Sequence, residues 1–157
     1  MGFIIRPARI EDATGIFDTH RRSIQEVCAK DYTAQQIQTW FPSTRTPARY
    51  ADFITNNEEV FIVELEKRII GYLHIQKDVL TACYILPEFI NKGIGTALFQ
   101  TAEGIFKKRN IKKITLTSSI TALTFYQKMG MKVIKPALHQ LNSDISLEVY
   151  IMEKNLA

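Results

Sequence analysis

Two glycines separated by one residue, Gly93-Ile94-Gly95, stand between an apolar stretch and a run with helical periodicity. The N-terminus of a helix carries unpaired backbone N–H groups and about half a positive charge, which together favour a phosphate group. Glycine has no Cβ, so an anion can approach its backbone closely. Lys92 adds a cation just before the pair, and no acidic residue lies between Gly93 and Ala102. The loop is therefore predicted to bind a phosphate or pyrophosphate.

A glycine pair before a helix also fits a tight turn that lets a helix pack on a strand, so the pattern alone leaves both interpretations open. Two common nucleotide motifs are excluded. A Walker sequence needs Gly-Lys-Ser or Gly-Lys-Thr, and neither tripeptide is present. A dinucleotide fingerprint needs a third glycine or alanine where Leu98 stands, and an acidic residue after the next strand.

The elements around this loop indicate an α/β (α+β) protein. Residues 59–66, 69–76 and 79–86 have strand-like patterns, and the short turns Lys67-Arg68 and Lys77-Asp78 join them into an antiparallel meander. The phosphate loop thus follows an antiparallel strand, unlike the loop of a Rossmann unit. The other expected elements are strands at 3–6, 112–118, 131–134 and 145–152, and helices beginning near 11, 33, 46, 94 and 120. Thr33 and Gln36 fit a capping box.

Composition limits the class of protein. The 157 residues, of which 46% are hydrophobic and 23% charged, favour a single domain, 1–157, with a substantial core. There is no apolar run of about 18 residues and no cleavable signal at Met1-Gly2-Phe3, so we expect a cytoplasmic protein without a membrane span. The net charge of +4 is compatible with an anionic ligand. The basic residues are spread along the chain, which argues against nucleic-acid binding as the reason for this charge.

Cysteine and histidine are sparse. Cys28 and Cys83 are isolated and are expected to be reduced core thiols. His20, His74 and His139 are scattered, which argues against a metal site. The aromatic residues between positions 32 and 53 are interpreted mainly as core, with the lining of an acceptor pocket left open.

Three segments, in this order along the chain, resemble the GNAT superfamily of acetyl-CoA-dependent N-acetyltransferases, and small bacterial members in particular. The first is Ile-Arg-Pro-Ala at 5–8, followed by Glu-Asp-Ala at 11–13. The second is Tyr-Ile-Leu-Pro-Glu-Phe at 84–89, followed by Lys-Gly-Ile-Gly-Thr-Ala-Leu at 92–98. The third runs from Ser118 to Met131 and contains the pair Phe125-Tyr126.

The resemblance implies a GNAT-type acyl-CoA N-acyltransferase fold, with a mixed, mostly antiparallel central sheet that is flanked by helices and splays open after strand 79–86. Acetyl-CoA would be the cosubstrate, with its pantetheine arm paired to the backbone of Tyr84, Ile85 and Leu86. The remaining cofactor-binding positions would be Asn91, Lys92, Gly93, Ile94, Gly95, Thr96 and Ala97 around the pyrophosphate and Ser119 near the pantetheine. Ile90 and Asn91 depart from the family pattern, and whether they weaken binding is left open.

Acetyl transfer needs a proton donor for the leaving thiolate and a neutral amine. Tyr126 matches the tyrosine that the family often uses as the donor; packing under Phe125 is the competing interpretation. If Lys77-Asp78 is a two-residue turn, His74 pairs with Thr81 and shares one face with Thr81 and Cys83, near the thioester. His74 is then a candidate base, with a structural role or a water relay as alternatives.

The sequence thus predicts an enzyme that moves acetyl from acetyl-CoA to a primary amine by direct attack. The acceptor is left open between a small amine, an antibiotic, an amino acid and a protein amine. The alternative is a catalytically weak acyl-CoA-binding sensor or regulatory module on the same fold. The apolar strand 145–152 would either pair across a homodimer or complete its own sheet.

Overall fold

A seven-stranded mixed sheet forms the centre of the computed structural model, which describes residues 2–156; the two end residues of the predicted domain 1–157 lie outside the described part. The strands are β1 (Ile4–Pro7), β2 (Glu59–Leu65), β3 (Arg68–Gln76), β4 (Val79–Ile85), β5 (Lys113–Ser119), β6 (Lys132–Gln140) and β7 (Ser146–Asn155). Their order across the sheet is β1-β2-β3-β4-β5-β7-β6. All neighbours are antiparallel except β4 and β5, which confirms the mixed, mostly antiparallel sheet.

The predicted meander is confirmed, with one difference in each hairpin. The β2–β3 turn is at Glu66-Lys67, one residue earlier than expected, and both residues have a positive φ. The β3–β4 turn does pair Gln76 with Val79, but the register shifts beyond it. Because of this bulge, His74 pairs with Ala82 and not with Thr81.

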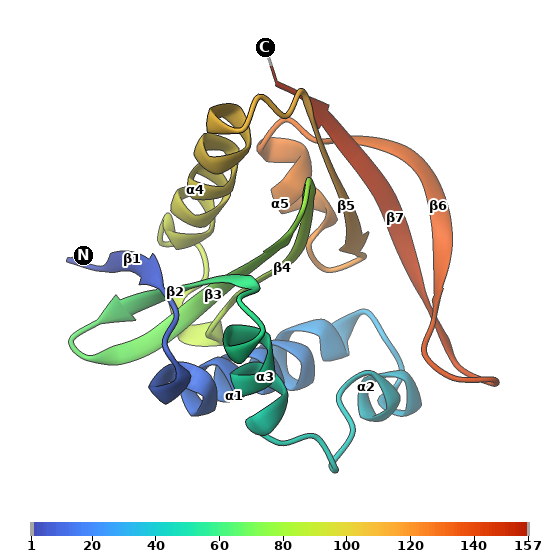
Figure 1. Ribbon diagram of the computed structural model, residues 1–157. Coiled ribbons are helices and arrows are strands. Elements are labelled where there is room, and N and C mark those ends of the chain that lie inside the picture. Colours follow the sequence, from blue (N-terminus) through green and yellow to red (C-terminus); the bar gives the residue numbers. More distant parts are fainter. Residues whose placement is uncertain (1, 157) are drawn as a thin grey trace.

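Strands β4 and β5 meet at their beginnings and then separate. One residue pair, Val79 with Thr115, is in register between these two parallel strands. Beyond it the sheet opens into two parts, β1–β4 and β5-β7-β6, which diverge in Figure 1 toward the side where α1 and α2 lie. The splay predicted after strand 79–86 is therefore present, although the strands are apart along most of β4 rather than only beyond its end.

Helices cover both faces of the sheet. They are α1 (Ala13–Arg22), α2 (Ala34–Trp40), α3 (Ala48–Thr55), α4 (Ile94–Lys108) and α5 (Leu123–Lys128), with 3-10 turns at Ile10–Asp12, Cys28–Lys30 and Pro87–Phe89. The α1 helix continues into a π-helical segment, Ser23–Val27. No helix within residues 2–156 is long and apolar enough to cross a membrane. The Thr33 capping box is confirmed, because the Thr33 hydroxyl accepts from Gln36 N and the Gln36 side chain accepts from Thr33 N.

The two faces of the sheet have separate cores. On the α4 and α5 side, the fully buried Leu98, Phe99 and Phe106 of α4 pack on apolar residues of β3, β4, β5 and β7. On the other side, Ile16 of α1 and Tyr50 of α3 pack on β2 and β3. A third cluster joins the end of α1 and α2 to Leu147 and Val149 of β7, so it links the helices to the far part of the splayed sheet.

The C-terminal strands differ from the prediction. β6 extends to Gln140 through Pro136, whereas the sequence indicated a strand that ends at 134. β6 is an edge strand exposed on both faces, so its sequence has no apolar alternation, and an edge tolerates a proline. The apolar β7 lies between β5 and β6, so it completes its own sheet and offers no edge to a second copy.

Candidate active site

The loop before α4 presents a row of free backbone donors. Gly93 is the N-cap of α4 with φ 83°, and Asn91 also has a positive φ of 63°. Ala97 N donates to Gly93 O at 3.1 Å, which is the first hydrogen bond of the helix. Within the described residues, the backbone N–H groups of residues 91–96 donate to no protein group. Residues 91–93 are exposed, so these donors are available to an anion.

The two glycines of the loop have different roles. A Cβ on Gly93 would meet no atom within 4 Å, so its backbone borders open space, while its positive φ disfavours other residues. A Cβ on Gly95 would lie 3.0 Å from the Phe125 ring and 3.2 Å from Ile85 Cδ1. Gly95 therefore allows α4 to pack closely on α5 and β4, and the close approach of an anion to its backbone stays a prediction.

The charge around the loop is favourable to an anion. The first turn of α4 has no acidic residue, and Lys92 is exposed beside it. Glu88 is the acid closest in sequence, and its Oε2 lies 3.0 Å from Arg22 Nη1 and 3.4 Å from Arg68 Nη2. These two guanidinium groups lower the pKa of Glu88 and balance its charge.

The free edge of β4 can be identified from its hydrogen bonds. Leu86 N donates to Ile70 O on β3 at 2.9 Å. Because antiparallel pairs alternate between bonded and non-bonded, Tyr84 also faces β3, and the backbone groups of Cys83 and Ile85 face the gap. This corrects the prediction for Tyr84 and Leu86, since of 84–86 only Ile85 presents its backbone to the gap.

The π-helical segment contacts this free edge. Ser23 is buried, and its hydroxyl donates to Ile85 O at 2.7 Å. The Ile85 carbonyl is thereby satisfied from the α1 side, while the Ile85 N–H stays free within the described residues. π-helical turns occur often at functional sites, and this one brings Ser23 under the splayed strand.

On the other side of the gap, the turn after β5 is held by hydroxyl groups. Ser119 Oγ accepts from Ala122 N at 3.1 Å, and the helix expected to begin near 120 begins at Leu123. Tyr32 Oη accepts from Ile120 N at 2.9 Å and donates to Glu148 O at 2.7 Å. The end of the π-helical region is thus fixed to β7.

Tyr126 lies on α5 within the core between α4 and β4. Its ring is buried, with the Phe125 ring centroid at 5.2 Å and the Phe99 centroid at 6.3 Å. No hydrogen bond joins its hydroxyl to a described residue, and the hydroxyl oxygen, unlike the ring, is not fully enclosed. Burial raises its pKa well above the usual value, and the nearby Cys83 and Tyr84 add to this shift, so the phenol keeps its proton at neutral pH.

His74 is positioned differently from the prediction. The shifted register places its side chain on the α3 side of the sheet, opposite to Cys83, so the expected shared face of His74, Thr81 and Cys83 was wrong. Its Nε2 lies 2.9 Å from Glu58 Oε1, and the Phe53 ring is 4.8 Å away. Burial lowers the pKa of His74 and Glu58 opposes the shift.

The cysteines are not activated. Burial raises the pKa of Cys83 to about 12 and that of Cys28 to about 11, so both thiols stay protonated. No group of three or more His, Cys, Asp or Glu within residues 2–156 is placed to hold a metal ion.

One feature of this region was missed in the sequence. In the sequence His20 is only one of three scattered histidines, yet its ring lies among the rings of Phe41, Tyr50, Tyr72 and Tyr84, a group that we call the His20 cluster. Its Nδ1 is 2.7 Å from Tyr50 Oη. Among residues 2–156, His20 Nε2 is the one buried side-chain nitrogen or oxygen atom without a hydrogen-bond partner.

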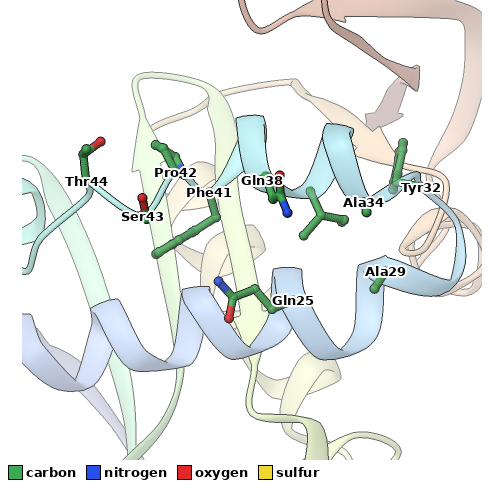
Figure 2. A pocket seen from close by; sticks show the side chains of 10 residues that line it. Gln25, Ala29, Tyr32, Ala34, Gln38, Phe41, Pro42, Ser43 and Thr44 are labelled. Carbon is green, nitrogen blue, oxygen red and sulfur yellow. The ribbon is translucent and has the colours of Figure 1, made fainter.

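A pocket of about 750 Å³ lies next to this cluster, between the end of α1 and α2. Figure 2 shows Gln25 directed toward Phe41, which also belongs to the His20 cluster. The pocket is lined by Gln25, Ala29, Tyr32, Ala34, Ile37, Gln38, Phe41, Pro42, Ser43 and Thr44, none of which carries a charge. The aromatic stretch 32–53 was the sequence signal for it.

Comparison with known proteins supports this geometry. A spermidine N(1)-acetyltransferase of Thermoplasma acidophilum is 26% identical over 145 residues, which are 85% of this chain and 90% of that protein. A GCN5-related N-acetyltransferase structure from Rhodopseudomonas palustris has a TM-score of 0.90 at 23% identity, covering 98% of this chain and 95% of that one. The PaiA N-acetyltransferase of Thermoplasma acidophilum, solved with coenzyme A, has a TM-score of 0.78 at 26% identity and covers 99% and 100%.

The family model described as "Acetyltransferase (GNAT) domain" matches residues 28–144, well over half of the chain. The match spans β2 to β6 and includes the splayed strands, the donor row before α4 and Tyr126. The chain belongs to the GNAT family of N-acetyltransferases.

Proposed function

We propose that this protein transfers an acetyl group from acetyl-CoA to a primary amine by direct attack, within a single domain. The observation that carries the proposal is the row of free N–H groups at residues 91–96, next to a β4 edge that faces a gap in the sheet. Such a row suits a pyrophosphate, and a free strand edge suits an amide-containing arm such as pantetheine. The coenzyme A complex of the related PaiA structure supports the same donor.

The residues around the gap give each part of acetyl-CoA a binding position. The pyrophosphate would accept from the backbone of residues 91–96 beside Lys92. The pantetheine amides would pair with Cys83 and Ile85, the two residues of β4 that face the gap. The thioester would then lie beyond Ile85 N–H, on the side of Tyr126.

In the chemical step, the neutral amine attacks the thioester carbonyl carbon, and the tetrahedral intermediate expels the CoA thiolate. The Tyr126 hydroxyl would give its proton to that thiolate, the amine nitrogen would lose one proton to water, and that proton would return through water to the Tyr126 phenolate. Tyr126 suits the donor role because its hydroxyl is unpartnered among the described residues and stays protonated. His74 has no such support, because its Nε2 is already paired with Glu58.

The proposal is tested by titrating the purified protein with acetyl-CoA and with acetyl-pantetheine in a calorimeter. We expect micromolar binding of acetyl-CoA and at least about tenfold weaker binding of acetyl-pantetheine, which lacks the diphosphate. A screen of amines that follows thiol release then tests turnover. Binding without turnover for any amine would favour the acyl-CoA sensor, and absence of binding would contradict both functions.

A further inference from the structure

His20 has a buried hydrogen-bonding atom with no partner, close to the strand whose edge faces the gap in the sheet. Its ring centroid lies 4.5 Å from that of Tyr84, the residue before Ile85 on β4. The side chains of Tyr84 and Tyr72 lie on the α1 and α3 side of the sheet, whereas those of Cys83 and Ile85 lie on the α4 side. An acceptor that reaches the gap from the α1 side would therefore pass the His20 cluster.

The neighbours of His20 determine which kind of atom would satisfy Nε2. Burial, with the nearby Arg45 and Arg49, lowers the pKa of His20 to about 3, so the imidazole is neutral. Burial raises the pKa of the Tyr50 hydroxyl, and the nearby Arg45 and Arg49 oppose this shift, so Tyr50 keeps its proton. We assign the Tyr50 proton to the 2.7 Å contact with His20 Nδ1, which places the single proton of the neutral imidazole on Nε2. Nε2–H is a donor that needs an oxygen acceptor.

Two positive charges flank the same cluster. The Arg45 guanidinium lies 4.6 Å from the centre of the Phe41 ring, and the Arg49 guanidinium lies 5.5 Å from the centre of the Phe53 ring. Neither arginine forms an ion pair with any described residue. The pocket beside Phe41 has no acidic lining residue, so a substrate with several positive charges would find no carboxylate there.

We propose that the acceptor is a small amine that also carries a carboxylate, such as an amino acid, and that Arg45 and His20 Nε2–H bind that carboxylate. This inference rests on the proposed acetyl transfer and specifies its acceptor. It differs from the activity in the name of the related spermidine N(1)-acetyltransferase, because spermidine is a polyamine without a carboxylate. The uncharged aromatic walls would hold the rest of the amino acid.

The test compares matched acceptors that differ only in the carboxylate. Purified full-length protein is assayed for thiol release from acetyl-CoA with each common amino acid, with its carboxamide, and with spermidine. We expect at least one amino acid to have a kcat/KM about tenfold or more above that of its carboxamide, because a hydrogen bond to a charged group is stronger than one to a neutral amide. Spermidine should be the poorest acceptor.

Substitutions of Arg45 test whether this residue causes the preference for a carboxylate. Arg45→Gln should raise the KM for the preferred amino acid about tenfold and remove most of the preference over its carboxamide, and Arg45→Lys should restore part of it. Arg21→Gln is the matched control, since Arg21 is paired with Asp18 on the surface of α1 and should leave the preference unchanged. Melting temperatures of the variants show whether each one folds.

Several results would overturn the inference: equal activity on acids and carboxamides, preference for spermidine, no acetylation of any amino acid, or an unchanged preference in Arg45→Gln. Calorimetry with acetyl-CoA separates this failure from that of the proposed function. If acetyl-CoA binds and another amine is acetylated, only the inference that the acceptor carries a carboxylate is wrong. If acetyl-CoA does not bind, both proposals fail.

Discussion

At the scale of single residues, Tyr126 and His74 differ in whether their polar atoms are available for proton transfer. The Tyr126 hydroxyl forms no hydrogen bond with a described residue, and its raised pKa keeps it protonated at neutral pH, so a proton is available when the thiolate leaves. The His74 nitrogen that would act as a base is already used by Glu58. We therefore expect the two side chains to respond differently to substitution.

Tyr126→Phe should lower kcat by about a hundredfold or more, since general acid catalysis contributes roughly 10²–10⁴-fold. The affinity for acetyl-CoA, measured by calorimetry, should change by less than about twofold because the ring still packs between Phe99 and Phe125. An unchanged kcat would show that another group protonates the thiolate.

His74→Gln should change kcat by less than about threefold, because His74 Nε2 is already paired with Glu58 and is not expected to act as a base. A threefold change corresponds to under 1 kcal/mol of activation free energy. The variant's free energy of unfolding, measured in urea, should fall by roughly 1–3 kcal/mol since the Glu58 contact becomes weaker in a partly buried site. A large loss of kcat with normal stability would restore the base role to this histidine.

The pH dependence of stability should follow His20. Burial lowers its pKa from 6.5 to about 3 in the folded protein, so below pH about 6.5 the unfolded chain binds more protons than the folded one. The free energy of unfolding should therefore fall as the pH decreases through this window. For a single histidine the loss between about pH 7.5 and 5.5 is roughly 1.4 kcal/mol.

His20→Gln removes this titration, so its urea unfolding should show a pH slope that is smaller by that amount. Since the pKa of His74 is also lowered, part of the slope should remain in the variant. An equal slope in both proteins would mean that His20 is not held neutral in the folded state.

At the scale of elements, the α4 N-terminus contains one glycine suited to anion binding and one that helix packing requires. Gly93 has a positive φ and borders open space, whereas Gly95 fits between Phe125 and Ile85. Adjacent glycines of one motif thus serve two purposes, which a pattern of glycines in a sequence cannot distinguish.

Gly93→Val should abolish measurable acetyl-CoA binding, because a β-branched residue at φ 83° is strained by roughly 1–3 kcal/mol and moves the loop donors. Gly95→Ala is the comparison: its new methyl group would press on Phe125, so we expect a lower melting temperature with a smaller loss of affinity. Normal acetyl-CoA affinity in a folded Gly93→Val protein would contradict the assignment of the loop.

Local elements were predictable from the sequence, and contacts across the chain were not. The Thr33 capping box, the meander and the α4 N-terminus each depend on a few neighbouring residues. The extra residue Thr81 in β4 carries no sequence signal, because it is neither glycine nor proline, yet it moved His74 to the other face. The contact between His20 and Tyr50 spans 30 residues and arises only when α1 and α3 pack together.

At the scale of the whole molecule, the edge strand β6 bears on association. It exposes Val133, Ile134 and Leu138, but Lys132, Lys135 and Pro136 lie on the same strand. Lysine and proline on an edge strand oppose pairing with another chain. A homodimer stays a prediction, and β7 is excluded as its pairing edge because both of its sides are already paired.

The single pair between Val79 and Thr115 makes the sheet, in mechanical terms, two plates joined at one corner. Tyr32, which bonds to Ile120 and Glu148, fixes the segment after α1 to the β5-β7-β6 part alone. A ligand that bonds to Cys83 and Ile85 and fills the gap would hold the two plates together along β4, so binding would reduce the mobility of β4 and β5. Amide hydrogen exchange in β4 and β5 should therefore slow on addition of CoA, while exchange in β1 and β2 stays constant. Equal rates with and without CoA in β4 would place the ligand outside the gap.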